Sequence, residues 1–166
     1  KGIGSYGDVS CFSFHATKVF NTIEGGAVTT KSKEIYEKLY NLKNFGIRGE
    51  ELVTEVGANA KMNELAAIMG LCNLNYIDEV FMERKKRYEA YVERIQQIEG
   101  IRQFEESSET EKNYAYFPIL VTESCQFDRD TLYEKLRNEG IYARKYFYPL
   151  TSDQACFKNK YRYMQL

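Results

Sequence analysis

The 166-residue sequence has few of the residues on which several enzyme classes depend. It contains no tryptophan, two prolines and a single histidine, His15. One imidazole excludes a metal site built from several histidines, and a Ser-His-Asp or Cys-His arrangement would have to use His15. No G-x-S-x-G sequence accompanies it. We therefore expect neither a serine hydrolase nor a metal hydrolase, and no bound metal ion.

Long apolar runs are also missing. No segment reaches the roughly 18–20 apolar residues of a membrane span, and no basic segment followed by an apolar one marks a signal peptide. The four cysteines are far apart and form no C-x-x-C pair, and no N-x-S/T sequon occurs. A chain of this size with a core does not need disulfides. We expect a cytoplasmic protein with reduced thiols and no membrane partner.

Neither sign of charge dominates, because 23 Lys and Arg residues balance 24 Asp and Glu residues. This balance excludes a basic nucleic-acid binder and a disordered acidic tail. Hydrophobic residues make up 43% of the chain, which is enough for a core. The chain opens at Lys1 without a methionine and passes at once into strand-like residues. We expect it to be a piece of a longer protein.

Hydrophobic periodicity predicts an α/β protein in which strands and helices alternate. A helix starts at the N-cap Asn63 and continues either as one long helix or as two helices with a break near residues 75–78. The boundary between two lobes is expected within this stretch, giving domains 1–80 and 81–166. The other predicted elements are strands at 9–14, 25–30, 114–122 and 141–144, helices at 31–44 and 128–138, and a loop at 45–57.

A glycine pattern at Gly2–Val9 fits both the dinucleotide fingerprint and the glycine-rich loop of protein kinases. The fingerprint must follow a strand and open a helix, whereas this segment opens the chain and runs into a strand. A kinase also needs H-R-D and D-F-G sequences, and neither occurs here. The match is therefore accidental.

A more informative segment is Phe12–Lys18, in which a strand delivers the hydroxyl of Ser13 and then, five positions later, the amine of Lys18. Two glycines follow, Gly25 and Gly26, as a tight return into the next strand. Burial lowers the pKa of an amine from about 10.4 and frees its lone pair for Schiff-base chemistry. On spacing alone, however, an ordinary surface lysine is the commoner outcome.

The sequence F-S-F-H-A-T-K-x(5)-E-G-G-A-V closely resembles the cofactor-lysine signature of the DegT/DnrJ/EryC1/StrS sugar aminotransferases. These are pyridoxal-phosphate (PLP) enzymes of fold type I. Three further blocks resemble the same family in the same order, at 41–46, 57–71 and 141–150. The resemblance implies the end of the PLP-binding large domain at 1–80 and most of the small α/β domain at 81–166.

The resemblance also implies roles for single residues. Lys18 would form the Schiff base with PLP and move the proton during catalysis. Ser13 would bind the cofactor phosphate, and Asn59 would reach that phosphate from the neighbouring subunit of a homodimer with shared active sites. The residues expected near the nucleotide-linked sugar are His15, Lys61 and Tyr148.

The implied reaction is transfer of an amino group, with glutamate as donor, to a keto-sugar nucleotide, for the amino-dideoxy sugars of surface polysaccharide. A branch of dehydratases with this fold carries histidine at the lysine position, so Lys18 favours transamination. A third alternative is a non-catalytic fragment that acts as a dimerising module. The aspartate that pairs with the pyridine nitrogen and the aromatic residue that stacks on the ring have no match here. We therefore expect little activity from the isolated 166 residues.

Overall fold

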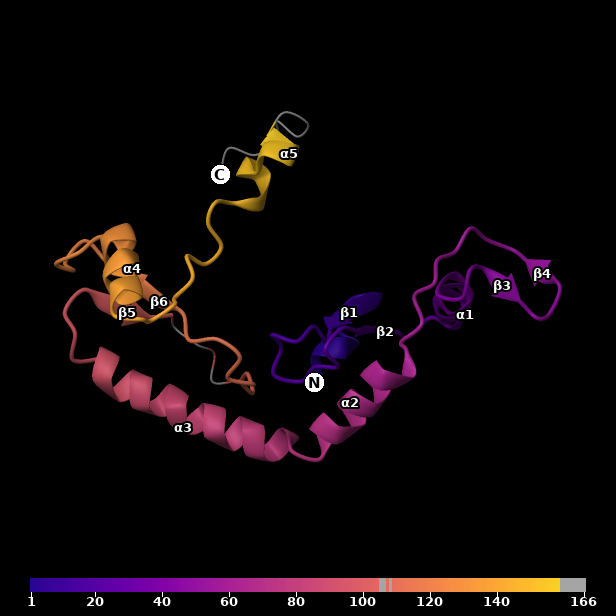
Figure 1. Cartoon of the computed structure of the whole chain (residues 1–166), viewed down its shortest axis with the longest axis horizontal. Coiled ribbons are helices and arrows are strands. Elements are labelled where there is room, and N and C mark those ends of the chain that lie inside the picture. Colours follow the sequence, from indigo (N-terminus) through magenta and orange to yellow (C-terminus); the bar gives the residue numbers. More distant parts are fainter. Residues whose placement is uncertain (105–106, 108, 159–166) are drawn as a thin grey trace. The chain divides into compact units, whose positions relative to one another are not determined.

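The computed structural model describes residues 1–104, 107 and 109–158. Its helices and strands alternate along the chain, which confirms the predicted α/β class (Figure 1). The chain divides into two compact units, one of Lys1–Lys86 with Asn113–Ala115 and one of Arg87–Lys112 with Tyr116–Leu166. They are called unit 1 and unit 2 below. The assignment of residues 1–80 and 81–166 to a large and a small domain stays a prediction.

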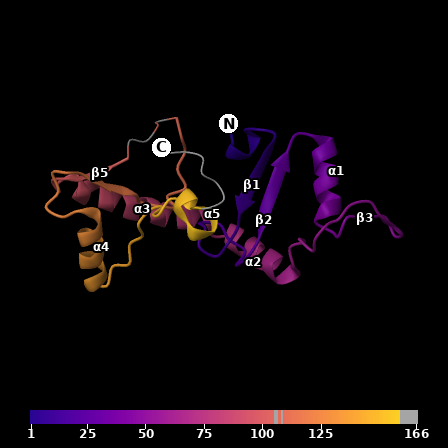
Figure 2. The ribbon, with the colours of Figure 1, turned by 90° about the horizontal axis from the view of Figure 1, so that it is seen from above.

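Unit 1 begins with the short 3-10 turn Ile3–Ser5 and a pair of antiparallel strands. Strand β1 (Val9–Ser13) pairs with β2 (Gly26–Thr30) in a register that sets Ser13 opposite Gly26. Helix α1 (Lys33–Leu42) follows, alongside the strands (Figure 2). The Ser32 hydroxyl caps this helix by accepting from the backbone N–H of Ile35. These elements confirm the predictions for residues 9–14, 25–30 and 31–44.

The segment predicted as a loop at 45–57 contains a small hairpin. Strand β3 (Ile47–Arg48) pairs antiparallel with β4 (Leu52–Val53), and Gly49 in the turn has a φ of 78°. Strands of two residues are too short to leave a period-two pattern in the sequence. The loop prediction was therefore wrong for these four residues.

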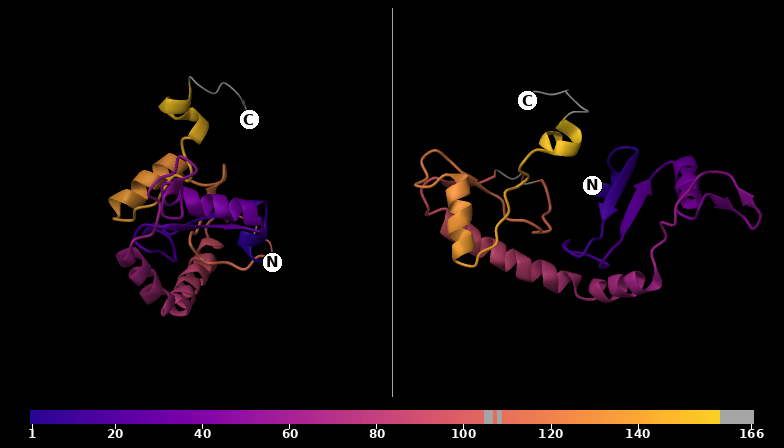
Figure 3. Two further views of the ribbon diagram at one scale, coloured as in Figure 1. Left: turned by 90° about the vertical axis from the view of Figure 1, so that its right-hand side faces the viewer. Right: turned by 45° about the horizontal axis from the view of Figure 1, so that its top comes forward.

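The long helical stretch is two helices. Helix α2 (Glu64–Leu74) is capped by Asn63, whose side chain accepts from the N–H of Ala66, and α3 (Ile77–Ile95) follows after a break. Figure 3 shows the two meeting at a bend, which measures 63°. This confirms the second of the two alternatives. Among the described residues no single helix is both long and apolar enough to cross a membrane, and α2 with α3 meet those criteria only when joined across the bend.

Unit 2 pairs β5 (Ile101–Gln103) with β6 (Ile119–Val121) in an antiparallel register. Helix α4 (Arg129–Asn138) follows, and the Asp128 side chain caps it by accepting from the N–H of Thr131. The chain ends its described part with the 3-10 turn Thr151–Asp153 and α5 (Ala155–Lys158).

Three predictions for unit 2 were wrong. Only the last part of 114–122 is a strand, β5 was not predicted, and 141–144 is not a strand. The last segment begins with two β-formers, Ile141 and Tyr142, but no described strand pairs with it to complete a ladder. Gly140, with a φ of 77°, follows the C-cap of α4, a position at which glycine commonly ends a helix.

Few apolar side chains are buried. In the described part of the chain, Ala66 is the one buried hydrophobic residue, at 7% exposure. Helix α2 is apolar on all sides, yet Leu65 and Leu71 are 78% and 65% exposed, whereas helices of that composition are normally covered all round.

Candidate active site

The loop between β1 and β2, residues 14–25, carries Lys18 and is closed by backbone hydrogen bonds. The N–H of Phe14 donates to the carbonyl of Gly25 at 2.8 Å, and the N–H of Thr22 donates to the carbonyl of Phe14 at 2.9 Å. Within it, the N–H of Lys18 donates to the carbonyl of His15 at 2.9 Å, which forms a turn. Lys18 is half-buried. These hydrogen bonds hold the backbone of the loop in one conformation. They therefore set the position of the Lys18 Cα within the loop.

Glycine is required where this loop returns to the sheet. A Cβ on Gly26 would lie 2.6 Å from the carbonyl oxygen of Phe12 on the paired strand. Gly25 has a φ of 158°, and a Cβ there would meet the hydroxyl of Thr22 and, at 2.9 Å, the methyl carbon of Met62. Gly26 therefore allows the close approach of the two strands, and Gly25 allows the close approach of Thr22 and Met62.

His15 is held by residues of its own loop. Its Nδ1 accepts from the backbone N–H of Thr17 at 3.3 Å and lies 3.0 Å from the Thr17 hydroxyl. A backbone N–H can only donate, so Nδ1 carries a lone pair and the ring proton lies on Nε2. Nε2 is 3.5 Å from a carboxylate oxygen of Glu24. In this arrangement His15 offers a hydrogen-bond donor at Nε2.

Ser13 stands at the end of β1, next to this histidine. The backbone N–H of His15 lies 3.5 Å from the Ser13 hydroxyl oxygen, a long hydrogen bond, and Ser13 is exposed. Three of the predicted site residues, Ser13, His15 and Lys18, are thus brought together by one loop.

Asn59 and Lys61 lie on a second segment, which runs beside the end of α1. The N–H of Phe45 donates to the carbonyl of Ala58 at 3.1 Å, and the N–H of Ala60 donates to that of Lys43 at 2.9 Å. Side chains alternate along such an extended segment. Asn59 and Lys61 therefore lie on the same side of it, and both are exposed.

The ammonium group of Lys61 has two partners from the end of α1. Its Nζ is 2.5 Å from the side-chain oxygen of Asn44 and 5.0 Å from the ring centroid of Phe45. Asn44 also forms a backbone bridge with Asn59. An aromatic ring and an amide oxygen orient an ammonium group without placing an opposite charge beside it. In the described part of the chain, no hydrogen bond or ion pair joins the side chains of Asn59 and Lys61 to the Lys18 loop.

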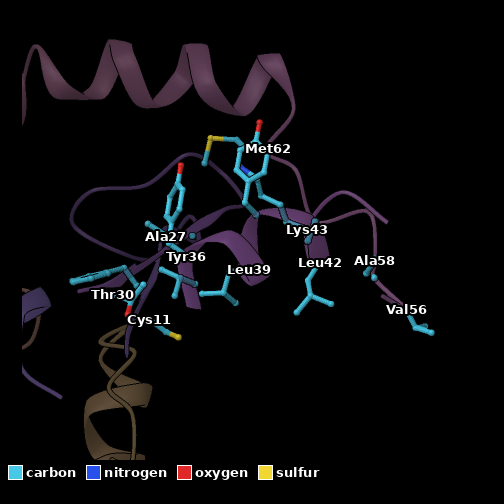
Figure 4. Close-up of a pocket in the computed structure, with 16 residues that line it drawn as sticks. Cys11, Ala27, Thr30, Tyr36, Leu39, Leu42, Lys43, Val56, Ala58 and Met62 are labelled. Atoms are coloured by element: carbon cyan, nitrogen blue, oxygen red, sulfur yellow. The ribbon is translucent and has the colours of Figure 1, made fainter. Parts of the chain in front are cut away.

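A cavity of about 930 Å³ lies between β1, β2, α1 and residues 56–62 (Figure 4). Its lining is mostly apolar, with Phe12, Val28, Leu39 and Leu42 among its residues. None of the six predicted site residues lines it. The cavity is therefore not formed by the predicted site residues.

Tyr148 lies in unit 2, in the irregular segment after α4. The guanidinium carbon of Arg129 is 4.2 Å from its ring centroid. Arg129 Nε and Lys145 Nζ lie 2.8 Å and 3.0 Å from one carboxylate oxygen of Asp130. The hydrogen bonds from Arg129, and then from Lys145, lower the pKa of Asp130 to about 2. Since the other five predicted site residues belong to unit 1, a place for Tyr148 beside them stays a prediction.

Sequence reasoning missed two residues that contact the predicted site, Glu24 and Asn44. Glu24 could have been found from the hairpin itself, because a register that pairs Ser13 with Gly26 also sets His15 opposite Glu24. Asn44 is 17 residues from Lys61, and no local pattern connects them. Within the described residues, no group of three or more His, Cys, Asp or Glu could hold a metal ion.

A sequence profile of the DegT/DnrJ/EryC1/StrS aminotransferase family matches residues 1–166. The chain belongs to this family. It is 42% identical over 154 residues to the dTDP-4-amino-4,6-dideoxy-D-glucose transaminase of Shigella dysenteriae, a match that covers 93% of this chain and 42% of the relative. Membership in this aminotransferase family implies PLP as the cofactor.

Solved structures agree with this assignment. The crystal structure of DesI in the presence of its TDP-sugar product matches with a TM-score of 0.85 and 34% identity, over 95% of this chain and 40% of DesI. A Bacillus cereus ATCC 10987 protein, whose name places it among PLP-dependent aminotransferases, matches with a TM-score of 0.81 and 30% identity, over 91% and 41% of the two chains. This member of the family thus spans about two fifths of the length of its relatives.

Proposed function

We propose that this chain is part of a PLP-dependent aminotransferase that transfers an amino group from glutamate to a keto-sugar nucleotide. The observation that carries the proposal is Lys18 in the hydrogen-bonded β1–β2 loop, within a sequence that matches the family throughout. The Shigella relative is named for a dTDP-linked amino-dideoxy sugar, and DesI was solved with a TDP-sugar product. Both names support a nucleotide-linked sugar as substrate, and the Shigella name supports an amino-dideoxy sugar. In this proposal the amino-dideoxy sugar is made for surface polysaccharide.

The donor set in unit 1 fits PLP by its chemistry. PLP carries an aldehyde and a phosphate, and when bound it supplies an electron sink for the carbanion formed during transamination. The Lys18 amine matches the aldehyde, and the same amine would carry the proton within the site. The Ser13 hydroxyl, and the Asn59 amide of a second copy in a homodimer, would donate hydrogen bonds to the phosphate oxygens.

The substrate would be held by groups of different charge. Lys61, positively charged and oriented by Asn44 and Phe45, suits the diphosphate of a sugar nucleotide. His15 would donate from Nε2 to a sugar oxygen, and Tyr148 would border the sugar. In this proposal residues 1–80 end the large domain, residues 81–166 form part of the small domain, and the enzyme works in the cytoplasm.

Borohydride trapping tests the central claim. The full-length protein is loaded with PLP, reduced with borohydride, digested and sequenced by mass spectrometry, and we expect the pyridoxyl group on Lys18. Lys18→Ala should lose the visible absorbance of the bound cofactor. Lys38→Ala, which removes an exposed lysine from α1, should keep it. Trapping at another lysine would contradict the proposed role.

Product analysis separates the proposed reaction from its alternatives. Incubation with glutamate and a keto-sugar nucleotide should yield 2-oxoglutarate and an amino sugar. A deoxygenated keto sugar without the amine would show a dehydratase instead. A full-length protein that takes up no cofactor would show a non-catalytic dimerising module.

A further inference from the structure

The loop that carries Lys18 rests on helix α2 through Thr22. Thr22 is 2% exposed, the lowest exposure of a polar residue in the described part of unit 1. Its hydroxyl donates to the carbonyl of Glu24 at 2.7 Å. Its methyl faces Gly70 so closely that a Cβ on that glycine would lie 2.8 Å from it. The absence of a side chain at Gly70 therefore lets the loop approach the helix.

A second contact lies one turn further along the same helix. The side-chain amide of Asn73 donates to the backbone carbonyl of Asn21 at 2.9 Å. The side-chain amide of Asn21 in turn donates to the backbone carbonyl of Lys18 at 3.4 Å, which is a longer and weaker bond. Two hydrogen bonds thus lead from α2 to the backbone of Lys18 itself.

Ala66, Gly70 and Asn73 are spaced by four and three residues, so they share one face of α2. Ala66 and Gly70 are buried and Asn73 is half-buried, whereas the larger apolar side chains Leu65 and Leu71 are exposed. The loop meets this face of α2 at Gly70 and at the side-chain amide of Asn73. Such a contact favours one arrangement, because a shift of the loop would leave the part-buried carbonyl of Asn21 without its donor.

We propose that Asn73 is a positioning residue for Lys18, acting through Asn21 to set the direction from which the amine enters the active site. This inference rests on the proposed role of Lys18 as the Schiff-base lysine. Asn73 does not itself contact Lys18. Gly70 supports the same arrangement by leaving room for Thr22.

Hydrogen exchange in the full-length protein tests the coupling between the helix and the loop. Asn73→Asp keeps the size of the side chain and removes the amide donor. Asn75→Asp is the matched control, because it places the same charge at the exposed C-cap of α2. Loss of one hydrogen bond with a stranded carbonyl should speed exchange of the Lys18 and Thr22 amides about tenfold. The control should change them less than about twofold.

Equal exchange in the two variants would overturn the proposal, and so would a uniform increase over all amides. If Asn73→Asp fails to fold, Asn73→Gln, which keeps a donor, decides the matter: protection of the Lys18 amide supports the proposal, and its loss overturns it. A spectroscopic readout accompanies the exchange data. The pH midpoint of the visible band of bound PLP should move in Asn73→Asp and stay in Asn75→Asp, because a merely structural contact would not alter the titration.

The same preparations separate this inference from the proposed function. If borohydride traps PLP on a lysine other than Lys18, the proposed function fails. The exchange rates of the loop amides still show whether Asn73 holds the loop.

Discussion

Thr22 and Gly70 lie in direct contact although 48 residues of sequence separate them, and the methyl of the threonine occupies the space that a Cβ on the glycine would need. The ring of Phe20 closes the same space from the side, at 3.7 Å from that position. Phe20 in turn packs edge-on against Phe14 with ring centroids 5.0 Å apart. The side chains that surround this glycine therefore belong to the loop of Lys18.

The variant Gly70→Ala tests this contact. Alanine is favoured over glycine in a helix by about 1 kcal/mol, but overpacking a filled site costs about 1–3 kcal/mol. We expect the clash with the buried, stiff threonine to outweigh the helix preference, so that the free energy of unfolding in urea falls. In the Thr22→Ser background, which lacks the methyl but keeps the hydroxyl, Gly70→Ala should no longer destabilise. An equal loss in both backgrounds would show that the contact is not the cause.

The sequence predicts best the elements in which a hydrophobic period extends over many residues or in which a capping residue precedes a helix. Asn63, Ser32 and Asp128 each precede a helix and accept from its first turn, which local chemistry alone dictates. The strands β3 and β4 are too short for a period, and β5 becomes a strand only because β6 comes back to it from 16 residues further on. The segment 141–144 opens with the β-formers Ile141 and Tyr142 but has no described strand as a partner.

The candidate site also has a part that the sequence predicts and a part that it does not. Ser13, His15 and Lys18 are close in sequence, so one motif predicts that they lie together. The contacts that orient them were not predictable, because Asn73 reaches Asn21 across 52 residues and Lys61 reaches Asn44 across 17. Such contacts depend on how the helices and loops pack, which no local pattern encodes.

A second prediction concerns Gly57, which stands at the start of the Asn59–Lys61 segment. A Cβ there would meet the backbone of Gly46 and, at 2.5 Å, the carbonyl oxygen of Leu42. Backbone atoms cannot move aside, so Gly57→Ala should displace Asn59 and Lys61 from the end of α1. We expect the KM for the sugar nucleotide to rise about tenfold, the equivalent of roughly 1.4 kcal/mol of binding.

Gly2→Ala is the control for that measurement, because no atom lies within 4 Å of the position of its Cβ. Steady-state kinetics of the full-length enzyme should show an unchanged KM for this variant. A Gly57→Ala enzyme with the parental KM would show that the segment does not bind the nucleotide.

A third prediction follows from the uncovered apolar surface of α2. When the 166 residues are produced alone, Leu65 and Leu71 should bind the dye ANS, because they are apolar and more than half exposed. The double change Leu65→Gln with Leu71→Gln should reduce the dye fluorescence, whereas the same change at two charged positions of α3, Glu79→Gln with Glu89→Gln, should not. Dye fluorescence as strong in the α2 variant as in the parent would contradict this interpretation of the surface.

The last prediction concerns the pH at which the contact between Arg129 and the ring of Tyr148 weakens. The pKa of Asp130 is lowered to about 2 because its ionised form accepts hydrogen bonds from Arg129 and Lys145. A lowered pKa in the folded protein means that the ionised group favours the folded arrangement above the ordinary value of 3.8, and that this contribution disappears as the pH falls toward 2. The contacts of Arg129 with Asp130 and with Tyr148 should therefore be constant from neutral pH down to about pH 4.

A pH titration followed by NMR tests this prediction. It records the carboxyl carbon of Asp130 and the ring protons of Tyr148. We expect both signals to titrate with one midpoint near the lowered pKa of about 2. Arg129→Gln removes the largest cause of the shift, so the midpoint of Asp130 should rise toward 3.8 and the ring signals should lose their dependence on it. Glu134→Gln, which removes a carboxylate from the same helix, should leave the midpoint in place. An unchanged midpoint in Arg129→Gln would mean that Lys145 alone holds the carboxylate, and that Arg129 does not link Asp130 to Tyr148.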